Sequence, residues 1–419
     1  MDTAITESAT GDGTGHGAPA EAGAVFTKPF TQQEPISEAA IARAVEVMRS
    51  GRLHRYNTGA GETAEAALLE RDYAAWQGAR FCLACASGGY ALAVALKAAG
   101  LKHGEPVLAN AYTLAPVPGA IHNAGGRAVF VEIGDDWRID CADLDARAAS
   151  SGARFLMLSH MRGHIGDMRA IGEICARRGI TLVEDCAHTM GARWEGRRSG
   201  SFGHVAAFST QTYKHLNSGE GGLLTTDDET IAARAILMSG SYMLYGRHGA
   251  APGAEAFEGL RLETPNYSGR MDNLRASILR AELALLDGRI ARWNALYAAI
   301  EAGLAGARGI RTVPLPAAEA HVGSSFQFHA DLPASAMPGF IAACAARGVE
   351  LKWFGAETPL GFTSRVDHWR MFGPPPDMPR TRAVLATTLD MRLPLTFEPG
   401  DCGLIARIIA EEAAAAMEG

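Results

Sequence analysis

Short apolar runs alternate with helical stretches through the first half of this 419-residue chain. The runs between residues 80 and 226 are RFCLACAS, EPVLANA, RAVFVEI, RFLMLSH, ITLVED, HVAAFS and GLLTT, and stretches such as GGYALAVALKAAG and DMRAIGEICARRG separate them. A strand that is apolar on both faces must be covered on both sides, which is typical of a parallel sheet between two layers of helices. The pattern therefore predicts an α/β fold with a mainly parallel sheet.

The remaining sequence divides the chain into three parts. Residues 1–24 are mostly Ala, Gly and Thr without Lys, Arg or aromatic residues, and are expected to form a disordered tail. Residues 25–300 contain two amphipathic helices, the sheet and most of one long helical pattern from about Asp272 to Gly303, and are expected to form a large domain. Residues 301–419 mix strand-like and helical runs, which predicts a smaller C-terminal α+β domain.

Composition excludes several classes of protein. The net charge is −7 and no basic stripe is visible, which argues against nucleic acid as a partner. No apolar run reaches the roughly 18 residues of a membrane span, and no targeting signal is expected. Seven cysteines, an odd number, indicate reduced thiols in the cytoplasm. The Cys82-x-x-Cys85 spacing has no second Cys/His pair, so buried core residues are favoured over metal or disulfide chemistry, and no metal is expected.

Three groups of polar residues follow predicted strands, where ligands collect in α/β sheets. Ser87-Gly88-Gly89 opens a helix whose N–H groups suit a phosphate. Asp185 ends the ITLVED run, where a carboxylate needs a cationic partner, and Lys214 lies between the run ending in Ser209 and a glycine-rich turn. Taken singly, these are also explained by an ordinary strand-to-helix turn, a helix-capping Asp and a solvated lysine.

Pyridoxal phosphate accounts for all three groups together. Its aldehyde forms a Schiff base with a lysine, a carboxylate keeps its ring nitrogen protonated, and a helix N-terminus holds its phosphate. The lysine is unusual in this chain, because only five of the 39 Lys and Arg residues are lysines.

The stretch EDCAHTMGARWEGRRSGSFGHVAAFSTQTYKHLNSGEGGLLTTDD, residues 184–228, closely resembles the signature of the DegT/DnrJ/StrS aminotransferases. RSGRL, GHIGDM, NYSGRM and LPL are supporting features, so the resemblance extends from about Ser37 to the C-terminus. It implies an aspartate-aminotransferase-like large domain of fold type I with a seven-stranded sheet. It also implies a homodimer with active sites between subunits, in which an amino acid donor and a keto sugar, cyclitol or small keto compound exchange an amino group.

The resemblance also implies roles for individual residues. Lys214 would be the Schiff-base lysine, and Asp185 the partner of the pyridine nitrogen. His188 would contact the phenolic oxygen of the cofactor. Ser209 and the Ser87–Gly89 turn would hold its phosphate.

Two implied contacts depart from the family pattern. Asn266 is the candidate that reaches the cofactor phosphate of the other subunit, but Ser268 and Gly269 are inserted after it, so Ser268 is the fallback. The family usually stacks an aromatic ring on the cofactor where this chain has Leu114. Tyr112 is then the candidate substitute, the alternative being that stacking is absent.

Substrate residues are less defined. Arg162 stands where the family has a neutral aromatic, and Tyr242 and Arg247 lie on an expected loop. Arginine suits a carboxylate or phosphate substrate, whereas the structural alternative pairs Arg162 with Asp167 or Asp185. The rival functions are a catalytically silent cofactor-binding sensor and another pyridoxal phosphate reaction, such as elimination or epimerisation. Family dehydratases carry His at the lysine position, so the lysine argues against that branch.

Overall fold

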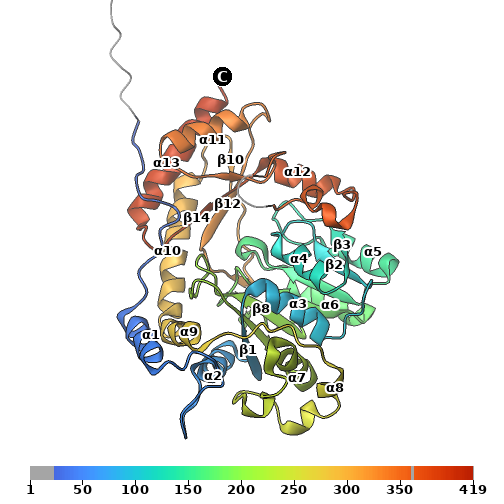
Figure 1. Cartoon of the computed structure of the whole chain (residues 1–419). Coiled ribbons are helices and arrows are strands. Elements are labelled where there is room, and N and C mark those ends of the chain that lie inside the picture. Colours follow the sequence, from blue (N-terminus) through green and yellow to red (C-terminus); the bar gives the residue numbers. More distant parts are fainter. Residues whose placement is uncertain (1–22, 360–362, 419) are drawn as a thin grey trace, which may run out of the picture.

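The computed structural model describes residues 23–359 and 363–418, so nearly all of the predicted tail lies outside the described residues. A seven-stranded sheet lies at the centre of the larger part of the molecule, with helices around it (Figure 1). Its strands are β1 (Phe81–Cys85), β2 (Pro106–Asn110), β3 (Arg127–Val131), β4 (Phe155–Ser159), β5 (Thr181–Asp185), β8 (Val205–Ser209) and β9 (Gly222–Thr226). Each of the seven apolar runs forms one of these strands, so the predicted α/β fold with a seven-stranded sheet is confirmed.

The strand order is β1-β9-β8-β5-β4-β2-β3. The neighbouring pairs from β8 to β3 are parallel, and β9 runs antiparallel to both β1 and β8. Successive residues of a strand point to opposite faces of the sheet. Phe155 and Met157 accordingly join one buried cluster, and Leu156 and Leu158 join another. This alternation explains why the runs are apolar throughout.

Helices cover both faces of this sheet. The cluster on one face includes residues of α3 (Gly88–Ala98), α4 (Pro116–Asn123) and α7 (Glu229–Ile236). The cluster on the other face includes residues of α5 (Cys141–Ser151) and α6 (Met168–Arg178). The two helices that precede the sheet are α1 (Glu38–Ser50), capped by Ser37 and ended by Gly51 at φ 67°, and α2 (Glu65–Gln77). Both agree with the predicted helices.

A second, antiparallel sheet contains β10 (Ile310–Arg311), β12 (Ser325–Ala330), β14 (Thr388–Arg392) and β13 (Lys352–Trp353), in that order. The helices α11 (Met337–Ala346), α12 (Pro379–Thr387) and α13 (Pro399–Ala416) belong to the same C-terminal part, which lies at the top of Figure 1. A third small sheet joins β11 (Glu319–Ala320) to β6 (Arg193–Trp194) and β7 (Arg197–Arg198). It therefore links the C-terminal part to the large one.

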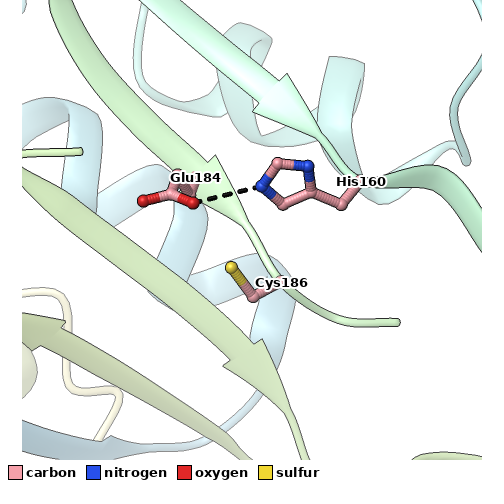
Figure 2. Close-up of side chains that lie close together, drawn as sticks. All are labelled: His160, Glu184 and Cys186. Carbon is pink, nitrogen blue, oxygen red and sulfur yellow. Dashed lines mark hydrogen bonds and ion pairs between the residues drawn. The ribbon is translucent and has the colours of Figure 1, made fainter. Parts of the chain in front are cut away.

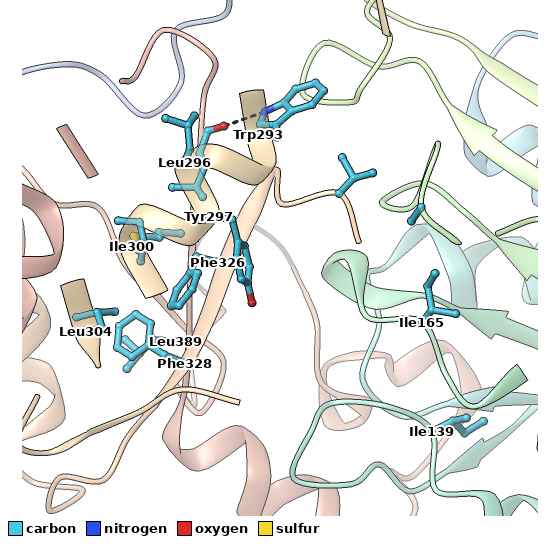
Figure 3. Close-up of a cluster of buried hydrophobic side chains, with 14 of the residues drawn as sticks. Ile139, Ile165, Trp293, Leu296, Tyr297, Ile300, Leu304, Phe326, Phe328 and Leu389 are labelled. Atoms are coloured by element: carbon cyan, nitrogen blue, oxygen red, sulfur yellow. Dashed lines mark hydrogen bonds between the residues drawn. The ribbon is translucent and has the colours of Figure 1, made fainter. Parts of the chain in front are cut away.

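The long helical pattern from about Asp272 to Gly303 is helical in the structure, but it is divided into two helices, α9 (Asn273–Leu283) and α10 (Leu286–Leu304). The break lets α9 pack on α1 and α2 while α10 packs on α13. Figure 3 shows α10 side chains such as Trp293 and Ile300 in one buried cluster with Phe326 of β12. The predicted domain boundary after residue 300 falls inside α10, and the division into two domains stays a prediction.

The other helices are short. One α-helical turn, α8, covers Leu260–Glu263, and a π-helical turn covers Leu237–Ser241. Short 3₁₀ turns cover Met161–Gly163, Tyr245–Arg247, Ala254–Phe257, Val366–His368 and Arg370–Phe372. Across residues 23–359 and 363–418, no helix is both long enough and apolar enough to cross a membrane.

Candidate active site

Two adjoining cavities, of about 550 and 80 Å³, lie at the carboxyl ends of β5 and β8. Both are lined by Lys214, His188, Ser209 and the Gly88–Gly89 turn. Asp185 lines the smaller cavity only. The three groups of residues that the sequence singled out therefore meet at one place, although the first and the last, Ser87 and Lys214, are more than 100 residues apart in the chain.

The Ser-Gly-Gly turn packs against the end of β8 and the start of β9, and neither Gly88 nor Gly222 has room for a side chain. A Cβ atom on Gly88 would lie 2.8 Å from the Cβ of Ser209, and one on Gly222 would lie 2.4 Å from the backbone of Ser87. Ser87 is the N-cap of α3, and its hydroxyl accepts a hydrogen bond from the N–H of Tyr90 at 3.1 Å. The open first turn of α3 thus faces the Ser209 hydroxyl across a narrow gap, which suits an anion such as phosphate.

Asp185, the last residue of β5, has a fixed orientation. Its carboxylate accepts hydrogen bonds from the Ser159 hydroxyl at 2.8 Å and from the N–H of Ala187 at 3.1 Å. The Thr113 hydroxyl in turn donates to Ser159 at 2.8 Å. Burial raises the pKa of Asp185, while these hydrogen bonds and the nearby Lys214 act in the opposite direction. A cationic group in the smaller cavity would stabilise the ionised form.

Lys214 lies in a loop between β8 and β9 whose two arms are hydrogen-bonded to each other. Thr210 donates its N–H to the Gly221 carbonyl at 2.9 Å, and Thr212 donates to the Gly219 carbonyl at 3.0 Å. Burial lowers the pKa of Lys214 to about 7, and the charge of Arg162 lowers it further than Asp185 restores it. The amine therefore loses its proton near neutral pH, as a nucleophile requires.

His188 is held by the backbone of the preceding strand–loop segment. Its Nδ1 accepts a hydrogen bond from the N–H of Arg162 at 3.0 Å. Burial and the neighbouring cations Lys214 and Arg162 hold the pKa of His188 well below its usual range, so the ring is neutral. With Nδ1 as acceptor, the proton is on Nε2, and His188 can donate that hydrogen bond to an oxygen atom in the cavity.

Arg162 lines the larger cavity, but its ion pair differs from both predicted alternatives. Its guanidinium pairs with Asp390 of β14 at 2.7 Å, whereas Asp167 caps α6 and Asp185 bonds to Ser159. The predicted pairing with Asp167 or Asp185 is therefore wrong, because the C-terminal sheet supplies a carboxylate that is distant in sequence. Arg162 has a left-handed backbone (φ 56°), which is uncommon for a residue other than glycine and is often found at functional sites.

The candidate for aromatic stacking does not reach the cavities. Tyr112 is fully buried in a separate cluster, and its ring centre lies 5.0 Å from that of Phe354 in an edge-on contact. Leu114 lines both cavities instead. The structure thus places an aliphatic side chain where the family usually has an aromatic ring, and gives no support to Tyr112 as its substitute.

Three other predicted residues line neither of these cavities. Tyr242 is 51% exposed, and Arg247 donates a hydrogen bond to the Tyr56 carbonyl at 2.7 Å. The side-chain oxygen of Asn266 accepts a hydrogen bond from the N–H of Ser268 at 2.8 Å. Within one chain, these residues do not meet Lys214, and their roles stay predictions.

Comparison with known proteins identifies the family. The model of the DegT/DnrJ/EryC1/StrS aminotransferase family matches residues 35–360. The chain belongs to this family. The resemblance drawn from the sequence is thereby confirmed.

Two relatives from the family show the range of its members. The chain is 34% identical over 250 residues to dTDP-3-amino-3,4,6-trideoxy-alpha-D-glucose transaminase of Micromonospora megalomicea subsp. nigra, which covers 59% of this chain and 63% of that protein. It is 31% identical over 268 residues to L-glutamine:2-deoxy-scyllo-inosose aminotransferase of Streptoalloteichus tenebrarius, covering 63% and 62%. The chain thus spans less than two thirds of the length of either relative.

The solved structures of Spr1654 from Streptococcus pneumoniae, in a PLP form and a PMP form, have the same fold. Their TM-scores are 0.77 and 0.79 at 17% identity, over 93% of this chain and all of that one. This similarity confirms the fold type I architecture that the resemblance implied.

The larger cavity also includes residues that the sequence analysis missed. They come from the loop around Lys214, from α10 and from the C-terminal sheet: Gln211, Tyr213, Trp293, Ser324, Ser325 and Arg392. Arg392 directly precedes the LPL motif, so this family motif was the available signal. The motif alone did not place Arg392 in the cavity, because that position depends on the pairing of β14 with β12, which brings Arg392 opposite Ser325.

Behind the site, His160, Glu184 and Cys186 bring possible metal-ligand atoms within 4.8 Å of one another (Figure 2). The Glu184 carboxylate already accepts hydrogen bonds from the N–H groups of Gly200, Phe202 and Gly203, and contacts His160 Nε2 at 3.1 Å. These bonds tie the turn before β8 to the strand that ends in Asp185. The two cysteines of the Cys82-x-x-Cys85 spacing are free thiols, and they lie in two different buried hydrophobic clusters.

Proposed function

We propose that the chain is a pyridoxal phosphate-dependent aminotransferase that moves an amino group from an amino acid donor to a carbonyl acceptor. The observation that carries the proposal is the meeting of Lys214 and Asp185 in the smaller cavity, beside the Gly88–Gly89 turn and Ser209. The relatives named above act on a nucleotide-linked sugar and on a cyclitol, which supports a keto sugar or cyclitol as the acceptor class.

The residues of the cavity fit the cofactor. The first turn of α3 and the Ser209 hydroxyl would hold its phosphate, in a gap that a Cβ on Gly88 would fill. Asp185 would face its ring nitrogen, and the Nε2 proton of His188 its phenolic oxygen. Bound there, pyridoxal phosphate supplies an aldehyde that exchanges amines and a ring that accepts electrons from the substrate carbon.

The protein groups then have separate tasks. Lys214 would hold the cofactor through its amine, and once an amino acid donor has replaced it there, the freed amine would move a proton to and from the substrate carbon. Its pKa of about 7 lets it do both near neutral pH. Asp185 would keep the ring nitrogen protonated, and the hydrogen bonds from Ser159 and Ala187 hold its two oxygens in place for this task. Leu114 and Pro116 line both cavities and contribute apolar surface that excludes water.

Borohydride reduction of the yellow protein followed by peptide mapping tests the assignment of Lys214. We expect the pyridoxyl group on Lys214, and a label on Lys97, Lys102 or Lys352 would contradict it. Asp185→Asn should keep the fold and lose most amino-group transfer, because an amide cannot keep the pyridine nitrogen protonated. Near-wild-type single-turnover rates in that variant would refute the role of Asp185.

We further propose that the active enzyme is a homodimer in which Asn266 reaches the cofactor phosphate of the other subunit. Asn266 lines neither cavity in its own chain, and the family resemblance of the PNYSGRM stretch supports the assignment. Mixing Lys214→Ala with Asn266→Ala protein tests it, because one composite site of a heterodimer then receives both wild-type residues. If heterodimers form and activity does not return, the cross-subunit contact is wrong.

A further inference from the structure

The larger cavity presents two guanidinium groups, and the protein neutralises only one of them. Arg162 forms its ion pair with Asp390 at 2.7 Å. Within residues 23–359 and 363–418, no carboxylate forms an ion pair with Arg392. Its guanidinium carbon lies 3.9 Å from the centre of the Tyr213 ring instead. Arg392 is therefore a cation in the cavity wall whose charge is left unbalanced by the described part of the chain.

The position of Arg392 brings this charge close to the reacting groups. Arg392 ends β14 and pairs with Ser325 of β12, so this edge of the C-terminal sheet forms one wall of the cavity. Tyr213, on which it stacks, is the residue next to Lys214. The charge of Arg392 is one of the causes that lower the pKa of Lys214 and of His188. An anion bound at Arg392 would thus lie within electrostatic reach of the amine.

The contact with Tyr213 also determines which chemistry the guanidinium can offer. Stacking covers a face of the planar group and leaves its N–H edge for hydrogen bonds. Two parallel N–H donors match the two oxygens of a carboxylate. Glu220, the acidic residue that lines this same cavity, forms no ion pair with Arg392 among the described residues. A substrate that removes water from the Arg392 guanidinium without pairing with it carries a desolvation cost in free energy. A substrate with an anionic group that pairs with the guanidinium is therefore favoured.

We propose that Arg392 is the anion-binding residue of the larger cavity and that it holds a carboxylate of the substrate. The inference rests on the proposed aminotransferase function, because it names the substrate class of the same site. The donor amino acid and an acidic acceptor are two sources of that carboxylate, since they occupy the cavity in alternate half-reactions.

The first test compares a carboxylate with its neutral amide in each half-reaction. The donors are L-glutamate and L-isoglutamine, and the acceptors are pyruvate and pyruvamide, each followed by the change in cofactor absorption. Arg392→Gln should lower kcat/KM about 10- to 100-fold more for the carboxylate than for the amide, as expected for a lost charged hydrogen-bond pair, because any effect through the pKa of Lys214 is the same for both. Arg392→Lys should keep part of the activity, and Arg407→Gln, an exposed arginine on α13, should change nothing.

A loss confined to L-glutamate assigns the carboxylate to the donor, and a loss confined to pyruvate assigns it to the acceptor. Losses in both arms mean that one residue serves both half-reactions. Equal losses for acid and amide, or no loss in either arm, overturn the proposal.

Calorimetric titration with succinate and succinamide gives a readout that needs no reaction. Succinate should bind wild-type protein about 10- to 100-fold more tightly than Arg392→Gln, while succinamide should not distinguish the two proteins. Charge-dependent succinate binding without any amino-group transfer would refute the proposed function and leave the role of Arg392 standing. Amino-group transfer that is unchanged in Arg392→Gln would support the proposed function and refute the role of Arg392.

Discussion

Lys214 titrates near neutral pH, and its charged neighbours shift its pKa in opposite directions. Burial is the largest cause of the lowered pKa, Arg162 and Arg392 lower it further, and Asp185 raises it. Removing a negative neighbour destabilises the protonated amine, and removing a positive neighbour stabilises it. Asp185→Asn should therefore lower the pKa of Lys214, and Arg392→Gln should raise it.

The effect of this environment on reactivity is large. At pH 7, an amine with a pKa of about 7 is roughly half unprotonated, whereas a lysine at its ordinary value of 10.5 has about one molecule in 3000 in that form. A nearby unit charge moves a pKa by about 1 or more. Each substitution should thus change the fraction of free amine by about tenfold or more on the acidic side of the titration.

Competitive acetylation of the cofactor-free protein between pH 5.5 and pH 9.5 measures this titration. Peptide mass spectrometry reports the labelling of Lys214, with the exposed Lys102 as the internal reference. We expect a midpoint near 7 in the wild type, a lower one in Asp185→Asn and a higher one in Arg392→Gln. A wild-type midpoint near 10, or shifts of the same sign in both variants, would refute the reasoning.

Other substitutions test the cavity and the core. Gly88→Ala would place a Cβ 2.8 Å from the Ser209 side chain at the end of β8. It should therefore weaken cofactor binding and lower the free energy of unfolding by about 1–3 kcal/mol, measured by thermal unfolding. Gly119→Ala is the control, because a Cβ at Gly119 would meet open space. Leu114→Phe should tighten cofactor binding about two- to tenfold by adding a stacking ring, measured by spectral titration. Burial lowers the pKa of both His164 and His215 to about 3, so the unfolded chain binds more protons than the folded one below pH 6.5. The free energy of unfolding should therefore fall as the pH drops from 6.5 towards 3, by up to about 1.4 kcal/mol per pH unit for each histidine. Denaturant unfolding at several pH values measures this fall. A flat profile over that range would contradict the assignment of neutral buried histidines.

Local pattern was sufficient for much of the fold and for the cofactor side of the site. The seven apolar runs became seven strands because residues such as Leu156 and Met157 must be covered on opposite faces of one sheet. Asp185 and Ser209 end two of these strands, and Lys214 follows shortly after. Since parallel strands carry their ends to one edge of the sheet, their meeting in one cavity could be predicted.

Features that depend on long-range pairing could not be predicted in this way. The helical pattern after Asp272 has no proline to mark the break between α9 and α10, which follows from their different packing partners. Arg162 was paired with acidic residues near it in the sequence, although the carboxylate that it contacts is Asp390, 228 positions later. Which of Tyr112 and Leu114 faces the cavity also depends on how the chain turns after β2.

The two sides of the cavity therefore derive from different parts of the sequence. The groups suited to the cofactor lie mostly between residues 184 and 228, within the segment from 35 to 360 that matches the family. The wall of the larger cavity includes Arg392, and Asp390 forms the ion pair with Arg162. Arg392 and Asp390 both lie beyond that segment. Similarity to sugar and cyclitol aminotransferases thus supports the chemistry at Lys214 more strongly than the identity of the acceptor. If Arg392 of the C-terminal sheet binds a substrate carboxylate as proposed, its variants test the charge of the substrate separately from the chemistry at Lys214.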